Sequence, residues 1–225
     1  PAMRARNDRK ELLIRKRLIE AAEGRLDGVI DEFEHVFELL AKHEKTVTIF
    51  GSARKPQDDQ ITTSAYELAA LLAKDGYSVV TGGGNGVMEA ANRGAYDIGG
   101  DSIGFNILLP NEQKLNDYTT ESFQFEHFFG RKVAMTLDAS GYIFFAGGYG
   151  TLDELFEILA LQQTMKIPRA PIVLFGSAFW KDIDSVMKKV LRDEFHTIAD
   201  EDIDLYTITD DYDEALGIIN KGADD

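Results

Sequence analysis

The run Phe144–Glu154 (FFAGGYGTLDE) combines residue types that can bind an anion beside a carboxylate. Clustered glycines let the backbone turn sharply, and the free N–H groups and dipole of a helix start favour a phosphate. Thr151 adds a hydroxyl. Glu154 is unusual there, because a phosphate within a turn repels it unless the carboxylate acts on a sugar or on water. The alternative is that Asp153 and Glu154 only complement the helix dipole. The combination favours catalytic chemistry over simple phosphate storage.

A second glycine-rich turn lies upstream in Thr81–Ala91 (TGGGNGVMEAA), again between an apolar run and a helical pattern. Two such turns in one short chain favour a binding function over simple chain reversal. Neither fits the dinucleotide fingerprint, since Val87 stands where the third glycine is needed, and neither is a P-loop, because no Gly-Lys-Ser/Thr follows. We therefore expect neither NAD binding nor triphosphate hydrolysis.

The composition is that of an acidic globular protein. The 225 residues are 44% hydrophobic, enough for one well-buried α/β domain. The formal net charge of −15 arises in residues 46–225, because residues 1–45 carry acidic and basic side chains in equal number. Nucleic acids and anionic membranes attract clustered Lys and Arg, so we expect neither as a partner. We interpret the acidic tail from Leu191 onward as a solvated face.

Metal and membrane signals are absent from the sequence. It has no cysteine, which excludes disulfides and thiolate metal sites, and its four histidines are too scattered to indicate a metal cluster. No apolar run approaches the ~20 residues of a membrane span, and no signal peptide is recognisable. We therefore expect a soluble cytoplasmic protein without a metal or other cofactor.

From Thr46 onward, short apolar runs alternate with amphipathic helical patterns, which predicts an α/β fold with a Rossmann-like, doubly wound parallel sheet. The expected strands are 47–50, 77–81, 102–107, 123–125, 142–145 and 171–176. The expected helices are 62–74, one ending near 92, 131–137, 152–165 and 180–191. In such folds ligands bind beyond the carboxyl ends of the strands, where both glycine turns fall.

The first 45 residues form an N-terminal helical extension in this interpretation, followed by one Rossmann-like domain, residues 46–225. Apolar residues at three- and four-residue spacings over 7–45, interrupted near 24–28, predict a helical hairpin. Its basic first part could contact an acidic partner, although covering a core or an oligomer interface is the commoner role.

Residues 46–190 resemble the Lonely Guy (LOG) family, phosphoribohydrolases that release cytokinin bases from their riboside 5′-monophosphates and are often mislabelled lysine decarboxylases. The most specific match is Gly147–Thr151 with Glu154, which corresponds to the family's Pro-Gly-Gly-x-Gly-Thr-x-x-Glu motif. Supporting matches are Gly51–Arg54, Thr81–Gly84 with Met88–Asn92, and Arg131 with Lys132.

Two positions depart from the family pattern. Ala146 replaces the motif proline, and Asn85 stands where the glycine loop commonly has proline. Because proline mainly fixes φ and lowers the entropy of the unfolded chain, we expect both losses to loosen a turn without removing a chemical group.

The resemblance implies cleavage of the N-glycosidic bond of a nucleoside 5′-monophosphate, a cytokinin precursor or an AMP-like nucleotide, to free base and ribose 5-phosphate. The transition state is oxocarbenium-like, so a carboxylate near the sugar can stabilise positive charge and activate water, the role we expect for Glu154. Arg131, which the family pairs with that glutamate, could bind ribose or phosphate or help the departing base. Lys132 is expected to contact an anion rather than to serve a pyridoxal site.

Substrate contacts are expected around both glycine turns and at the end of the first strand. For Glu89, a role as a first-turn dipole residue is equally open. Met88, Phe105 or Phe129 could pack on the base, with core membership as the alternative. The expected substrate-binding residues are Ser52, Arg54, Gly83, Gly84, Asn85, Glu89, Lys132, Gly147, Gly148, Gly150 and Thr151, with Arg131 and Glu154 catalytic and no metal ligand.

A non-catalytic nucleotide or molybdenum-cofactor carrier on the same fold is the alternative function, since fold alone does not separate the two. Retention of both Arg131 and Glu154 favours the enzyme, because phosphate binding needs the glycine turn but no adjacent carboxylate. The resemblance also implies a homodimer or higher homo-oligomer. The apolar stripe from Leu155 to Met165 is a candidate dimer surface, although a helix buried within the domain has the same pattern.

Overall fold

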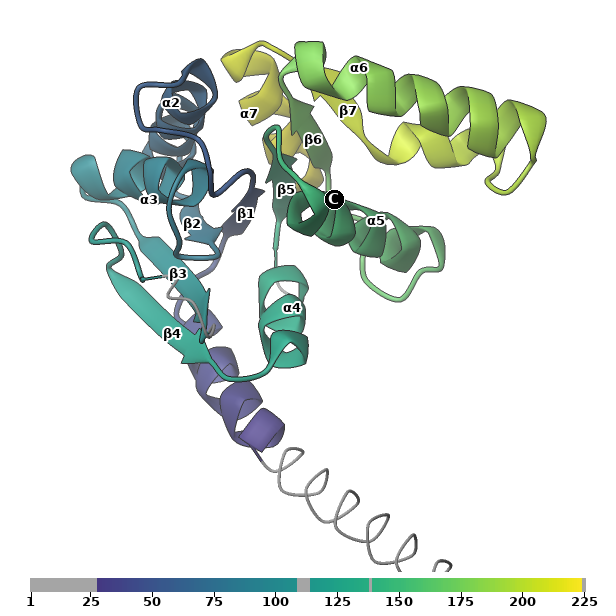
Figure 1. Cartoon of the computed structure of the whole chain (residues 1–225). Coiled ribbons are helices and arrows are strands. Elements are labelled where there is room, and N and C mark those ends of the chain that lie inside the picture. The colour runs from purple at the N-terminus through teal and green to yellow at the C-terminus, as the bar shows by residue number, and fades with distance from the viewer. Residues whose placement is uncertain (1–27, 109–113, 138, 224–225) are drawn as a thin grey trace, which may run out of the picture.

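The computed structural model describes residues 28–108, 114–137 and 139–223. A seven-stranded parallel sheet in the order β4-β3-β2-β1-β5-β6-β7 forms its centre (Figure 1). The strands are β1 (Thr46–Phe50), β2 (Ser78–Thr81), β3 (Ser102–Ile107), β4 (Glu121–Phe125), β5 (Gly141–Phe144), β6 (Ile172–Phe175) and β7 (Thr207–Thr209). The chain moves outward from β1 to β4 and then crosses to the other side of β1, which places a topological switch point between β1 and β5.

Helices cover both faces of this sheet, as the doubly wound prediction requires. The helices are residues 28–40, α2 (Gln60–Lys74), α3 (Val87–Asp97), α4 (Phe128–Thr136), α5 (Tyr149–Gln163), α6 (Ser177–Val186), the π-helix η1 (Met187–Glu194), the 3₁₀-helix η2 (Asp200–Leu205) and α7 (Tyr212–Ala223). The helix expected over 180–191 is α6 continued by η1, an arm that reaches beyond the edge of the sheet (Figure 1).

Alternate side chains of the strands contribute to two separate hydrophobic cores, one on each face of the sheet. On β1, Val47 and Ile49 are buried with side chains of α2, α3 and α7, whereas Phe50 belongs to the opposite core with residues of α4 and α5. The Phe50 ring stacks on Phe144 of β5, with 4.7 Å between ring centroids. Side chains alternate across a strand, and here both faces of the central strands are covered by helices. Consecutive strand residues are therefore apolar, and these apolar runs identified the strands in the sequence.

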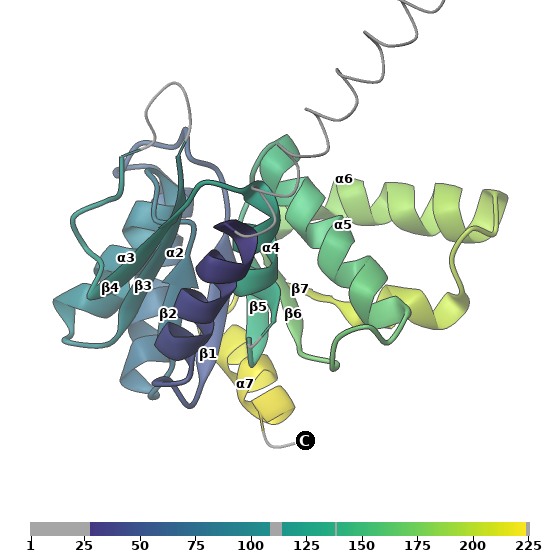
Figure 2. The same cartoon turned by 90° about the horizontal axis from the view of Figure 1, so that it is seen from below.

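The N-terminal helix, residues 28–40, packs into the same core as the sheet. Val36, Leu39 and Leu40 are buried in the cluster that contains α4 and α5 side chains. Just beyond the helix, the buried His43 ring contacts Ser78 Oγ at 2.8 Å and Glu121 Oε1 at 3.1 Å, at the starts of β2 and β4. Figures 1 and 2 show the helix lying beside α4. The first part of the predicted hairpin, residues 7–27, lies outside the described residues.

The acidic tail contains elements that the sequence interpretation did not include. Strand β7 pairs with β6 at the sheet edge, and α7 buries Ala215 and Ile219 completely. Asp211 caps α7, because its Oδ1 accepts a hydrogen bond from Glu214 N at 2.9 Å. Interpreting the whole tail as a solvated face was therefore wrong. Its acidic side chains lie mostly outward, but its apolar ones complete the core.

Within the described ranges, none of the helices has the length and apolar character needed to cross a bilayer. The same residues contain no group of three or more His, Cys, Asp or Glu side chains arranged to hold a metal ion.

Candidate functional site

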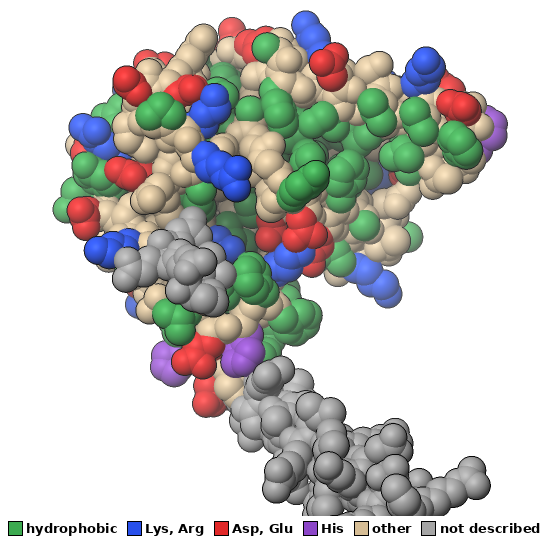
Figure 3. All heavy atoms as spheres, viewed as in Figure 1, with side chains coloured by type: hydrophobic (Ala, Val, Ile, Leu, Met, Phe, Trp, Pro, Cys, Tyr) green, Lys and Arg blue, Asp and Glu red, His purple; other side chains and the backbone are tan. Residues whose placement is uncertain are grey.

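A cleft of about 680 Å³ opens where the ends of β1 and β5 diverge, at the switch point of the sheet. Its walls come from the turn after β1, the start of α3, the helix α4 and the first turns of α5. The lining residues are Ile49–Arg54, Gly82, Met88, Phe128, Arg131, Lys132, Met135 and Gly148–Glu154. Figure 3 shows acidic and basic side chains side by side near the middle of this face.

The start of α5 forms one wall of the cleft. Gly148 is the N-cap residue and supplies no side chain to cap the helix. The first intrahelical hydrogen bond runs from Leu152 N to Gly148 O, so the N–H groups before Leu152 have no partner within the helix. A Cβ at Gly147 would lie 2.0 Å from the Thr151 hydroxyl, which explains the glycine there. At Gly148 and Gly150 a Cβ would meet nothing within 4 Å. These two glycines therefore face open space beside a helix N-terminus, a favourable place for an anion.

Glu154 lies further along α5 and is buried, with 9% of its surface exposed. Its Oε2 is buried and has no hydrogen-bond partner among the described residues. Burial raises the pKa of the Glu154 carboxyl to about 7; Glu157 and Asp153 add to the rise, and Lys132 and Arg131 oppose it. A carboxyl with a pKa near neutral pH and a free oxygen in a cleft is suited to take up and release a proton.

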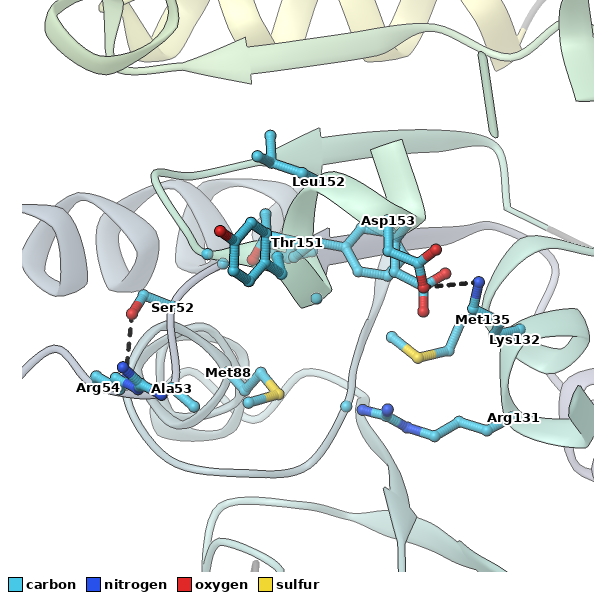
Figure 4. A pocket seen from close by; sticks show the side chains of 18 of the residues that line it. Ser52, Ala53, Arg54, Met88, Arg131, Lys132, Met135, Thr151, Leu152 and Asp153 are labelled. Carbon is cyan, nitrogen blue, oxygen red and sulfur yellow. Dashed lines mark hydrogen bonds and ion pairs between the residues drawn. The ribbon is translucent and has the colours of Figure 1, made fainter. Parts of the chain in front are cut away.

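Arg131 reaches the cleft from α4 and lies against β3 and the turn after β2. Its Nε donates to the carbonyl oxygen of Phe105 on β3 at 2.8 Å. Its guanidinium lies over Gly82, since a Cβ on that glycine would come within 2.1 Å of Nη2. Burial lowers the pKa of the Arg131 guanidinium, and the attraction of Glu154 opposes this. In Figure 4 the side chain extends toward Met88, away from neighbouring Lys132.

Lys132 points to the opposite side of the cleft, toward α5 (Figure 4). Its Nζ forms ion pairs with Asp153 at 2.8 Å and Glu157 at 2.5 Å. Hydrogen bonds to these two carboxylates raise the pKa of the lysine despite its partial burial. Lys132 thus joins α4 to α5 and adds positive charge beside Glu154. Its expected contact with a substrate anion stays a prediction.

The turn after β1 contributes Ser52 and Arg54 to the cleft, as expected. Ser52 N donates to Ala146 O at 3.1 Å, which ties this turn to the one after β5. Its side-chain Oγ accepts a hydrogen bond from Arg54 N at 3.2 Å (Figure 4). The Arg54 side chain is exposed at the rim of the cleft. Ala146 therefore keeps the backbone link between the two turns although the motif proline is missing.

The glycine turn after β2 packs closely against the loop that precedes β4. Gly83 has a φ of +66°, and a Cβ there would lie 2.8 Å from Leu115. Its N–H donates to Thr81 Oγ1, and Gly84 O accepts from Asn116 Nδ2. Five of the expected substrate contacts lie outside the cleft lining, namely Gly83, Gly84, Asn85, Glu89 and, in the second turn, Gly147. The residue of this turn that does line the cleft is Gly82.

Some apolar lining residues were not found from the sequence. Phe128 and Met135 of α4 border the cleft, together with Met88, which was considered as a base contact. Phe105 is fully buried in the core and Phe129 is exposed outside the lining, so neither is placed to pack on a base there. The spacing of Phe128, Arg131, Lys132 and Met135 at three and four residues was the available signal for a helix face.

Fold and site together define a doubly wound α/β protein whose switch-point cleft combines a helix N-terminus, a buried carboxylate and an arginine. The family model described as "Possible lysine decarboxylase" matches residues 88–219, more than half of the chain. The chain belongs to this family, the LOG family, as its motifs predicted.

Named relatives and solved structures agree with this assignment. The probable cytokinin riboside 5′-monophosphate phosphoribohydrolase LOG4 of Oryza sativa subsp. japonica is 26% identical over 183 residues, covering 80% of this chain and 78% of the relative. The X-ray structure of the structural-genomics target TM1055 has a TM-score of 0.60 at 26% identity, covering 79% of this chain and 99% of that one. The molybdenum cofactor carrier protein of Chlamydomonas reinhardtii shares the fold, with a TM-score of 0.61 at 20% identity over 81% and 100% of the two chains.

Proposed function

We propose that this protein hydrolyses the N-glycosidic bond of nucleoside 5′-monophosphates, releasing the free base and ribose 5-phosphate. The observation that carries this proposal is Glu154, a buried carboxyl with a raised pKa and an unpartnered oxygen beside Arg131. The relatives named as phosphoribohydrolases support the same reaction class.

The arrangement suits a ribose phosphate lying along the first turns of α5. The N–H groups around Gly148, Gly150 and Thr151 would hold the 5′-phosphate. Glu154 follows Tyr149 by five positions, so its Cα lies ~7.5 Å along the helix axis from the start of α5, and a ribose would lie between the carboxylate and the phosphate. The repulsion between phosphate and carboxylate is thereby reduced by distance.

In the proposed reaction, ionised Glu154 stabilises the positive charge that develops on the ribose and accepts a proton from the attacking water. The C1′–N bond breaks as the water oxygen bonds to C1′. The departing base takes the bonding electrons and is protonated, so that the proton accepted by Glu154 is returned. Arg131 is placed to bind the ribose, the phosphate or the leaving base.

The environment of Lys132 argues against the decarboxylase chemistry suggested by the family description. Lysine decarboxylation with pyridoxal phosphate requires a neutral lysine amine to form a Schiff base. Lys132 is the one lysine among the described residues that line the cleft, and two carboxylates hold it in its charged form. These ion pairs support a structural and electrostatic role for it.

The first test incubates purified protein with AMP, GMP, IMP, CMP, UMP and isopentenyl-AMP and measures free base and ribose 5-phosphate by chromatography. We expect release from at least one nucleotide, with kcat/KM rising as pH increases through about 7, because Glu154 must be ionised to act. Glu154→Gln should abolish turnover and retain nucleotide binding, measured by calorimetry. Gly148→Val should weaken the binding itself, since its side chain fills the open space at the helix start.

Near-normal turnover by Glu154→Gln would contradict the assignment of the catalytic carboxylate. Nucleotide binding without release of base from any substrate would favour a carrier function instead. The predicted homo-oligomer is checked in the same preparation by light scattering coupled to size-exclusion chromatography.

A further inference from the structure

Glu32, on the N-terminal helix, is buried against the start of α4, with 7% of its surface exposed. Its Oε1 accepts hydrogen bonds from the backbone N–H groups of Glu126 at 2.7 Å and His127 at 3.3 Å. The same oxygen lies 3.2 Å from the His127 ring Nδ1. Glu32 thus contacts a segment more than 90 residues away in the sequence.

These contacts anchor the segment that leads into α4, where the N-cap residue itself supplies no capping side chain. His127 is the N-cap residue of α4, and its side chain forms no capping hydrogen bond. The carboxylate accepts from the N–H of His127 and from that of the residue before it, and its negative charge is favoured near a helix N-terminus by the helix dipole. The second oxygen, Oε2, lies close to the first turn, because a Cβ on Gly130 would come within 2.7 Å of it.

The other end of α4 is fixed separately to the sheet. Thr48 of β1 donates from Oγ1 to Met135 O at 3.0 Å, and the Tyr142 hydroxyl of β5 donates to Thr136 O at 2.5 Å. Between the two anchored ends lies Arg131, directly after Gly130, with its side chain extended into the cleft. Because α4 has nine residues, a shift of its first turn moves Arg131 with it.

A carboxylate is a costly choice for a purely structural contact here. Oε2 of Glu32 is buried and has no hydrogen-bond partner among the described residues. Burying charge without full compensation destabilises a fold, and an apolar side chain of similar volume is often better tolerated. The contacts of Oε1 and the position of Oε2 against Gly130 make this carboxylate specific to the geometry at the start of α4.

We propose that Glu32 is a positioning residue that acts through Arg131: it ties the N-cap residue of α4 and the residue before it to the N-terminal helix and so holds the Arg131 guanidinium in the cleft. This inference rests on the proposed function for its kinetic consequences but not for its structural ones. It also gives the N-terminal helix a role in the site, although no residue of that helix lines the cleft within the described part of the chain.

The kinetic test is a double-mutant cycle between Glu32 and Arg131 with the nucleotide that the panel identifies. Glu32→Ala is expected to lower kcat/KM roughly 10- to 100-fold, in the range seen when supporting contacts of functional groups are lost. In an Arg131→Ala background the same change should alter kcat/KM by less than about twofold, because the side chain through which Glu32 acts is then absent. Equal losses in both backgrounds would overturn the proposal.

Matched variants separate positioning from general loss of structure. Glu34→Ala removes an exposed carboxylate two residues along the same helix and should leave kcat/KM unchanged. Glu32→Gln keeps an acceptor oxygen for the two N–H groups and should retain more activity than Glu32→Ala. If Glu32→Ala does not fold, the cycle is run with Glu32→Gln, whose smaller loss should likewise vanish in the Arg131→Ala background.

A second measurement does not depend on turnover. The Nε–H signal of Arg131 in a ¹⁵N–¹H spectrum, identified by its loss in Arg131→Lys, should be protected from exchange with water by its bond to Phe105 O. Glu32→Ala, or Glu32→Gln to a smaller extent, should accelerate that exchange, and Glu34→Ala should not. An unchanged signal in folded Glu32 variants would refute the positioning role. Absence of nucleotide hydrolysis by the wild type would refute the proposed function. The exchange measurement alone would then test whether Glu32 positions Arg131.

Discussion

At the scale of single residues, the site depends on where a few side chains place charge. Glu154 is on a helix face that turns into the protein, so its carboxyl loses water without gaining a hydrogen bond to Oε2. Lys132 offsets part of this penalty from α4, while Asp153 and Glu157 compete for the same lysine. The result is a carboxyl that titrates near neutral pH.

This carboxyl should also make stability depend on pH. Its pKa rises from 4.5 to about 7 on folding, so between these values the folded state binds more protons than the unfolded state. The stabilising contribution of the protonated group is present below about pH 4.5 and is lost as pH rises through about 7. The free energy of unfolding of the wild type, relative to Glu154→Gln, should therefore fall by roughly 3 kcal/mol across this window.

Urea denaturation of both proteins at several pH values between 5 and 8 measures this difference. Glu38→Gln, which changes an exposed carboxylate on the N-terminal helix, serves as the control and should track the wild type. A difference between wild type and Glu154→Gln that stays constant, or grows in favour of the wild type at high pH, would contradict the burial argument.

At the scale of elements, the stripe from Leu155 to Met165 spans two environments along α5 and the turn that follows it, where Met165 lies. Leu155 and Ile158 of α5 are fully buried in the core, whereas Phe156 and Met165 are 44% and 86% exposed. The buried half accounts for the amphipathic pattern by packing within the chain. The exposed half is where the predicted oligomer contact on this helix would have to form.

The C-terminal helix α7 should contribute strongly to stability despite its acidic sequence. Ile219 is completely buried, and its Cδ1 packs so closely on β5 that a Cβ at Gly141 would lie 2.5 Å away. Ile219→Ala is expected to lower the free energy of unfolding by about 2–5 kcal/mol, as for other buried aliphatic truncations.

Denaturant unfolding monitored by fluorescence can test this, because the protein has a single tryptophan. Trp180 is fully buried, and its Nε1 donates to Phe144 O and Phe175 O, so it reports on the sheet next to α7. Asp213→Ala on the exposed side of α7 should change stability by less than about 0.5 kcal/mol. Equal effects of the two substitutions would show that α7 is not part of the cooperative fold.

At the scale of the whole molecule, the net charge of −15 acts against the compact state through self-repulsion. Screening should relieve it, so the midpoint of thermal unfolding should rise by roughly a few degrees between 0.02 and 0.5 M NaCl. Parallel scans in KCl separate screening from binding of a particular ion. A midpoint that falls with either salt would show that local ion pairs such as those of Lys132 outweigh the overall repulsion.

The sequence alone determined the fold class, most of the strands and the sheet edge at which the cleft lies. Short apolar runs that alternate with amphipathic helical patterns identified six of the seven strands and placed both glycine turns at the carboxyl edge. Strand β7 was missed because it has three residues among acidic ones. The helix α7 was missed although Tyr212, Ala215, Leu216 and Ile219 have helical spacing, because the surrounding charges outweighed that pattern.

Only the tertiary structure decided which side chains share the cleft and in what state. The sequence predicted a catalytic role for Glu154 and substrate contacts for Gly83 and Gly84, and the folded chain places Glu154 in the cleft lining and the two glycines outside it. The contact of Glu32 with Glu126 and His127 joins segments more than 90 residues apart, and no local pattern encodes it. The pKa of Glu154 likewise depends on desolvation and on charges from another helix, which arise only when the chain is folded.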